Sequence, residues 1–312
     1  MKRNTCRGIL TLAALVVLVL ATYYPAAAQH FSEWSAPVNL GPTINSSSAD
    51  FGSAISKNGL SLYISSTRLG GFGGQDIWVS QRASLDDPWG LPVNLGPNIN
   101  SSSNDSLPNF SRDGHRMFFS SNRPGGVGGT DIWVSWRAHT HDDFGWQLPV
   151  NLGAGVNSTA FDAAPHYFEN EDVGIPLLFF TSGRLGGLGD LDTYVSALTA
   201  DGSFGPAVFV PELSSPQRDA RPNLRHNGLE IFFYSDRPGS VGSFDLWVST
   251  RETTLDDWST PVNLGDTVNS TSADQHPAVS SNGQTLFFNS DRPGGFGSQD
   301  LYMTTRTKLR GR

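Results

Sequence analysis

The sequence SSNRPGGVGGTDIWVS, residues 120–135, decides the fold of this chain because it recurs along it. It joins the end of one apolar run to a turn of Pro and Gly, and a second apolar run, Asp131–Ser135, follows the turn. In every copy an Arg stands eight residues before an Asp, and the copies follow one another at steps of 55, 61, 53 and 55 residues. The other four copies begin at Ser65, Thr181, Tyr234 and Asn289. Five copies identify a repeat protein, and the period of the repeat indicates its architecture.

Each repeat contains four short apolar segments separated by turns. In the second copy an extended run starts at Asp105, and a turn leads to the apolar segment 116–121. The glycine-rich turn leads to segment 131–137, and a short fourth segment covers 150–153. No helical period is present in the unit. Four short strands in a unit of this length predict one blade of a β-propeller.

The two ends of the repeat array complement each other. The array opens with a fourth-strand sequence, Val38–Gly41, and ends on a third strand, 301–306, with no fourth strand after it. The N-terminal strand is therefore expected to complete the last blade, which leaves the ring without a free edge. We predict an all-β, five-bladed β-propeller of four-stranded antiparallel blades, as a single domain over residues 29–312. An open five-unit solenoid is the alternative, and it would expose strand edges.

The N-terminus has the pattern of a secretory signal. Basic residues precede the apolar run 9–20, and small residues follow it, which predicts a signal peptide over residues 1–28 with cleavage before Gln29. The only cysteine, Cys6, precedes the apolar run, so the mature chain has no disulfide. We predict an exported protein, periplasmic or extracellular, that is not embedded in a membrane after cleavage. An uncleaved N-terminal anchor is the alternative.

The repeat resembles the TolB-type WD40-like β-propeller repeat, over about residues 34 to 306. In the second copy the resemblance rests on Pro108, Asp113-Gly114, Phe119-Ser120-Ser121, Arg123 and Asp131-Ile132-Trp133. It implies an exported, envelope-associated propeller that binds partners. The third copy departs from the pattern, since it inserts residues around Glu169 to Ile175.

Three polar columns recur in all five repeats, at the start of the first strand, the end of the second and the start of the third. We expect an Arg between two Asp side chains in every blade, because a guanidinium fork matches two carboxylates. Fivefold repetition favours a structural network; the alternative is an acidic ring at the channel mouth. The columns are Asp50, Asp105, Asp162, Asp219 and Asp274; Arg68, Arg123, Arg184, Arg237 and Arg292; and Asp76, Asp131, Asp192, Asp245 and Asp300.

Positions that differ between the repeats are better candidates for a ligand site. Two and four residues after the leading Asp, the innermost strand carries polar side chains in some blades only. The candidate site at the channel mouth consists of Asn109, His166, Arg221, Asn223 and His276. The alternative for these residues is hydrogen bonding between blades.

Metal binding has little support in the sequence. Asp190 and Asp192 supply far fewer than the six to eight oxygen ligands that Ca²⁺ takes. His139 and His141 lie on a polar loop without a third ligand nearby. No cofactor or metal is predicted, and Ca²⁺ is the one ion left open.

The charge excludes one class of function. With a net charge of -8 and no basic run, a nucleic-acid partner is not expected.

The leading prediction is an exported, non-enzymatic, monomeric propeller that serves as a binding or scaffold module in the cell envelope. Its partner would be an envelope or extracellular protein, or a glycan. The alternative is a glycan-active hydrolase, glycosidase- or sialidase-like, with its site at the central channel. No catalytic residue is assigned, but an unmatched carboxylate in the channel would favour the enzyme.

Overall fold

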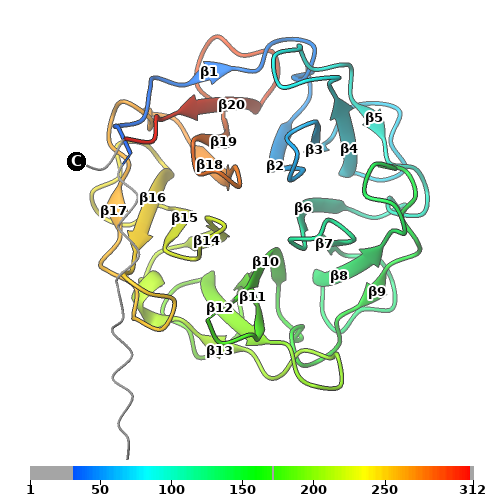
Figure 1. Ribbon diagram of the computed structural model, residues 1–312, viewed down its shortest axis with the longest axis vertical. Coiled ribbons are helices and arrows are strands. Elements are labelled where there is room, and N and C mark those ends of the chain that lie inside the picture. Colours follow the sequence, from blue (N-terminus) through cyan, green and yellow to red (C-terminus); the bar gives the residue numbers. More distant parts are fainter. Residues whose placement is uncertain (1–30, 171, 310–312) are drawn as a thin grey trace, which may run out of the picture.

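The computed structural model describes residues 31–309 except residue 171. These residues form five four-stranded antiparallel sheets arranged as blades around one axis (Figure 1). The predicted all-β, five-bladed propeller is thus confirmed. The predicted signal peptide lies outside the described residues. Within the described part of the chain, no helix has the length and apolarity needed to cross a membrane.

From the axis outwards, the strands of blades 1 to 4 follow the order of the sequence, and in blade 5 the outermost strand is the N-terminal strand of the chain. The first strands, next to the axis, are β2 (Asp50–Ile55), β6 (Asp105–Phe110), β10 (Asp162–Glu169), β14 (Asp219–Leu224) and β18 (Asp274–Val279). The second strands are β3 (Ser61–Ser66), β7 (Arg116–Ser121), β11 (Pro176–Ser182), β15 (Glu230–Ser235) and β19 (Thr285–Ser290). Blades 1 to 5 are numbered in this order.

The outer strands complete the blades. The third strands are β4 (Asp76–Gln81), β8 (Asp131–Trp136), β12 (Asp192–Ala197), β16 (Asp245–Thr250) and β20 (Asp300–Thr305). The fourth strands have two residues each: β5 (Val93–Asn94), β9 (Val150–Asn151), β13 (Val208–Phe209), β17 (Val262–Asn263) and β1 (Val38–Asn39). A 3-10 helix, η1 (Pro211–Leu213), follows β13 where the other repeats have the sequence Leu-Gly.

The ring closes through the two ends of the chain. In blade 5 the order is β1-β20-β19-β18, with Val38 opposite Met303 and Asn39 opposite Tyr302. The backbone N–H of Leu40 also donates to the carbonyl of Leu301, at 3.0 Å. The prediction that the N-terminal strand completes the last blade is confirmed, and no blade is left with an unpaired radial edge.

The hydrophobic core lies between neighbouring blades. The second strands supply its largest members, and Phe118, Phe180 and Phe232 are each at most 1% exposed. Between blades 1 and 2, Met117 and Trp146 belong to one buried cluster with Tyr63 of blade 1. Both faces of each sheet are covered, which explains why the second strands read as nearly continuous apolar runs.

The Arg column binds only one of the two Asp columns, so the expectation of an Arg between two Asp side chains is wrong. Arg123 Nη2 lies 2.6 Å from the Asp105 carboxylate, and its Nε donates to Ser121 Oγ at 2.9 Å. The second carboxylate, Asp131, instead accepts the backbone N–H groups of Val127 and Gly128 in the glycine-rich turn. Both arrangements recur in all five blades. The reason is local: the tight turn leaves its amides pointing inwards, and the carboxylate at the end of the turn is the acceptor within reach.

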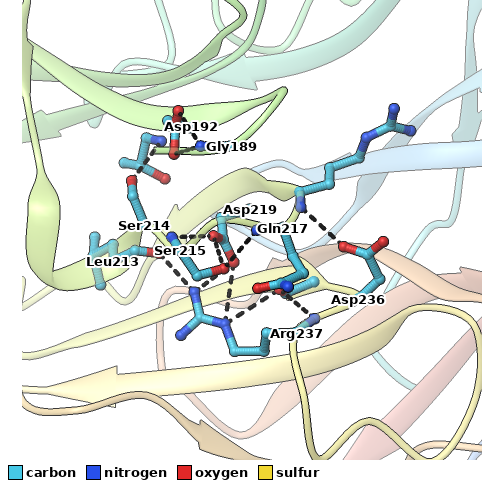
Figure 2. Close-up of polar contacts among 12 residues, drawn as sticks. Gly189, Asp192, Leu213, Ser214, Ser215, Gln217, Asp219, Asp236 and Arg237 are labelled. Atoms are coloured by element: carbon cyan, nitrogen blue, oxygen red, sulfur yellow. Dashed lines mark hydrogen bonds and ion pairs between the residues drawn. The ribbon is translucent and has the colours of Figure 1, made fainter. Parts of the chain in front are cut away.

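Figure 2 shows both types of contact where blades 3 and 4 meet. Arg237 donates to the Asp219 carboxylate and to the carbonyl of Leu213. Asp192 accepts the backbone N–H of Gly189 and makes no contact with Arg237 in this view. Asp219 and its four equivalents are 0% exposed. The fivefold repetition of these ion pairs, each with a buried carboxylate and a partly exposed Arg, indicates that they serve the fold.

Each first strand carries a β-bulge next to the axis. The pairing register shifts there in every blade, and the bulged residue has a positive φ. Only Gly52 of the five is a glycine; the others are Leu107, Ala164, Arg221 and His276, with φ between 52° and 60°. Non-glycine residues in this region are strained, and bulges with such strain commonly redirect side chains near functional sites.

Candidate active site

The five residues predicted for the channel mouth do not form one site. Arg221 projects from blade 4 across the axis, and its Nη2 donates to the carbonyl of Ser53 in blade 1, at 3.0 Å. It is 1% exposed, and burial lowers the pKa of its guanidinium to about 10. Arg221 therefore blocks the axis and separates two mouths.

The other four candidates lie on different sides of this block. Asn109 and His166 line a cavity where the first strands end, and Asn109 Nδ2 lies 3.0 Å from His166 Nδ1. His276 lines the cavity at the opposite mouth, where the first strands begin. Asn223 is buried, and its Oδ1 accepts the backbone N–H of Val279 in the next blade at 2.9 Å. Asn109 makes the same contact to Tyr167 N–H, so the alternative of hydrogen bonding between blades describes both Asn side chains.

We call the mouth where the first strands end the strand-end mouth. Five side chains that differ in chemistry, one from each blade, lie together there. Each stands seven residues after the leading Asp of its blade, and all five line one cavity of about 140 Å³. That volume is well above the roughly 10–15 Å³ that one water requires. The five residues, in blade order, are Lys57, Arg112, Glu169, His226 and Ser281. Two cations, one carboxylate, one imidazole and one hydroxyl thus face one space.

Blade 3 places its carboxylate there by a longer hairpin. β10 has 8 residues whereas the other first strands have 6, and the extra residues carry Glu169 at its end. Glu169 pairs with Pro176 of β11 in the backbone register, so its position is held by the sheet rather than by a free loop. Among the residues that the structure describes, no hydrogen bond or ion pair engages its carboxylate.

The charges at the strand-end mouth act on one another. Partial burial of the His226 ring lowers its pKa below the ordinary value of 6.5, and the cations of Arg112 and Lys57 lower it further. The Glu169 carboxylate opposes this shift, which places all four groups within electrostatic reach. His226 is therefore neutral at pH 7 and able to accept a proton. Deeper in the cavity, burial and then the charge of Arg221 lower the pKa of His166 to about 3.

The opposite mouth has a different character. Its cavity, of about 590 Å³, is lined by amides and hydroxyls together with His276, Phe51 and Phe161, and none of the described residues in this lining carries a carboxylate. The two acidic residues considered for Ca²⁺ are engaged elsewhere: Asp190 pairs with Arg218 at 2.6 Å, and Asp192 accepts turn amides. Within residues 31–309, leaving out 171, no three His, Cys, Asp or Glu side chains gather in a metal-binding arrangement.

The residues of the strand-end mouth could have been found in the sequence by one signal. Most columns of the repeat keep their chemistry from blade to blade, but the column seven residues after the leading Asp holds a different residue type in every copy and includes both signs of charge. The insertion after Glu169 marks the same place. The columns chosen in the sequence analysis lie two and four residues after the Asp, deeper along the strand, where packing between blades uses the polar groups.

Comparisons with known proteins support the propeller fold and change which class of function is considered first. No family model matches the chain, and no curated protein matches it. An α-L-arabinofuranosidase from Lactobacillus brevis has a similar structure, with a TM-score of 0.60 and 13% identity over 86% of this chain and 93% of that chain. The catalytic domain of a GH62 α-L-arabinofuranosidase from Coprinopsis cinerea has a TM-score of 0.56 and 14% identity, covering 88% of this chain and 97% of that chain.

Two further solved structures are similar to this chain. A xylan β-1,4-xylosidase from Bacillus halodurans C-125 has a TM-score of 0.55 and 17% identity over 86% of this chain and 54% of its own. TolB from Acinetobacter baumannii matches with 16% identity and a TM-score of 0.49, too low to bear on the argument. The leading expectation of a non-enzymatic binding or scaffold module is therefore wrong as the main interpretation, since the three structures with TM-scores of 0.55 to 0.60 are glycoside hydrolases. At these identities the likeness itself shows the fold alone.

Proposed function

We propose that the protein is a glycan-active hydrolase whose active site is the strand-end mouth. The observation that carries the proposal is Glu169, a carboxylate without an equivalent in any other blade, which lines the cavity at the channel mouth. A repeated network serves the fold, whereas catalysis needs one asymmetric constellation. The propeller fold shared with arabinofuranosidases and a xylosidase supports the same class of reaction.

Glu169 and His226 are the two acid–base groups of the site. Most glycosidases use a pair of carboxylates. Here the second group is the imidazole of His226, which is neutral at pH 7 and can take a proton from water. The water oxygen then bonds to the anomeric carbon as the glycosidic C–O bond breaks, and the leaving oxygen takes a proton from Glu169 in its carboxylic-acid form. The proton that His226 took from water then returns to Glu169 through solvent, which restores both groups for the next turnover.

Three earlier expectations remain part of the proposal. Export by residues 1–28 would bring the enzyme to extracellular or envelope glycans, and a monomer would suffice, because one chain supplies the whole mouth. The repeat motif supports membership of the TolB-type family on its own residues. No cofactor is assigned a role.

The test is hydrolysis of a panel of 4-nitrophenyl glycosides, including α-L-arabinofuranoside, β-D-xyloside and β-D-glucuronide, by residues 29–312. Glu169→Gln is expected to lower kcat/KM about 10²–10⁴-fold, the usual contribution of a general acid or base. Glu212→Gln is the matched control, because Glu212 is exposed on η1 and is absent from the cavity lining. A wild-type protein inactive on the whole panel, or a Glu169→Gln variant with full activity, would overturn the proposal.

A further inference from the structure

The strand-end mouth has a basic side and an acid–base side. Lys57 and Arg112 come from blades 1 and 2, next to each other in the ring, whereas Glu169 and His226 come from blades 3 and 4 (Figure 1). Ser281 of blade 5 stands between the two groups. A ligand that fills the cavity therefore meets cations on one side and the proposed catalytic pair on the other.

The lining of the mouth is more basic than the chain as a whole. The protein has a net charge of -8, whereas the described residues that line the mouth include two cations, Lys57 and Arg112, and one carboxylate, Glu169. Within the described residues, the Lys57 ammonium makes no hydrogen bond or ion pair. A cation without a protein partner at the wall of a cavity attracts an anion, and focusing by the low-dielectric walls strengthens the attraction.

A groove extends from the mouth on the same side. It has a volume of about 770 Å³, runs between blades 5 and 1, and shares Ile55, Lys57 and Ser281 with the mouth. Trp89 lines it, with the guanidinium of Arg82 stacked 4.3 Å from its ring. Lys57 thus lies where the small cavity joins the larger groove.

We propose that the substrate is an anionic glycan, with the negative group of one sugar held by Lys57 in the mouth and the adjoining sugars in the groove between blades 5 and 1. Calling this ligand a substrate rests on the proposed function, but its binding does not depend on hydrolysis. The anionic group is a uronate carboxylate or a sulfate ester, since both match the Lys57 ammonium.

The experiment measures binding separately from chemistry. The Glu169→Gln variant is titrated with methyl β-D-glucuronide, with methyl β-D-glucoside and with a glucoside 6-sulfate, at low and at physiological salt, by calorimetry or ligand-observed NMR. We expect the glucuronide or the sulfate to bind at least tenfold more tightly than the neutral glucoside, and this preference to weaken with salt. The two anionic ligands distinguish the carboxylate from the sulfate source.

Two variants locate the site. Lys57→Gln is expected to reduce the affinity for the anionic sugar about tenfold and to leave the neutral sugar unaffected. Lys308→Gln is the matched control, since Lys308 is exposed and does not line the mouth or the groove. Equal affinities for charged and neutral sugars, no binding of any of the three, or an unchanged preference in Lys57→Gln would each overturn the inference.

The outcomes separate this inference from the proposed function. If anionic sugars bind through Lys57 but wild-type protein cleaves no glycoside, the hydrolase proposal fails and the ligand class stands. If the wild type cleaves neutral arabinofuranosides and binds no anionic sugar, the hydrolase proposal stands and the inference fails.

Discussion

Asp143 fastens blade 2 to blade 1, and its removal is the most informative test of how the ring is held together. It lies on the segment between β8 and β9, and its carboxylate accepts hydrogen bonds from Ser61 Oγ at 2.5 Å and Tyr63 Oη at 2.7 Å in blade 1. Gln81 of blade 1 donates to it at 2.8 Å, and Arg137 of its own blade pairs with it at 2.8 Å. No other blade has this arrangement, because the residues equivalent to Tyr63 are all Phe.

The expected loss follows from burial. The side chains of Asp143 and Arg137 are both only 3% exposed, so Asp143→Ala leaves a buried guanidinium without its counterion. Breaking a buried pair by removing one partner costs about 3–5 kcal/mol. For a domain with an unfolding free energy of about 5–15 kcal/mol, this is a large fraction of the total. Tyr63→Phe removes two hydrogen bonds with charged groups, one donated to the Asp143 carboxylate and one accepted from Arg137 Nη1 at 3.1 Å, and should cost at least about 1.5–3 kcal/mol.

The assay is equilibrium unfolding in urea at pH 7, monitored by tryptophan fluorescence. Asp142→Ala, one residue away and exposed, is the matched control and should cost about 1 kcal/mol or less. Adding Arg137→Met to Asp143→Ala should recover part of the loss, because the double variant buries no unpaired charge. If Asp143→Ala lowers the free energy of unfolding by less than about 1 kcal/mol, the contacts of Asp143 do not hold blades 1 and 2 together as described.

The same carboxylate makes stability depend on pH. Burial alone would raise the pKa of Asp143, but hydrogen bonds from Ser61, Tyr63, Arg137 and Gln81 outweigh it and lower the pKa below the ordinary value of 3.8. A carboxyl with a lowered folded-state pKa stabilises the fold above its unfolded pKa, and this contribution is lost as the pH falls through the folded value. Wild-type unfolding free energy should therefore fall below about pH 4 more steeply than that of Asp143→Asn.

Three further predictions concern the core, the bulge and the proposed catalytic imidazole. Phe118→Ala should cost about 3–5 kcal/mol in urea unfolding, since Phe118 is 1% exposed; a loss near zero would contradict its burial. Gly52→Ala should lower the melting temperature, because φ is +54° and a Cβ would stand 2.4 Å from Leu107 Cδ2; Gly41→Ala has a similar φ but open space, and the excess over that control measures the clash. Hydrolysis should decline as the pH falls through the lowered pKa of His226, with a midpoint below 6.5, and an unchanged midpoint in Lys57→Gln would contradict the electrostatic coupling.

The candidate site was only partly accessible to sequence reasoning. Of the five predicted residues on the innermost strands, Asn109 and His166 line the strand-end mouth. Arg221 could not be placed beforehand, because its reach across the axis to Ser53 depends on the diameter of the closed ring. The bulge also turns its side chain in a way that simple strand alternation does not predict.

The sequence by itself determined the architecture of this protein. Five copies of the Arg-to-Asp motif set the number of blades, and the displaced fourth strand at Val38–Asn39 set how the ring closes, because strand pairing depends on local patterns that repetition makes unmistakable. The tertiary structure alone decided which side chains meet. Asp131 binds turn amides instead of Arg123, and Asp143 reaches Tyr63 in another blade. Glu169 shares a cavity with residues of four other blades because ring closure brings equivalent positions, more than fifty residues apart in the chain, to one mouth.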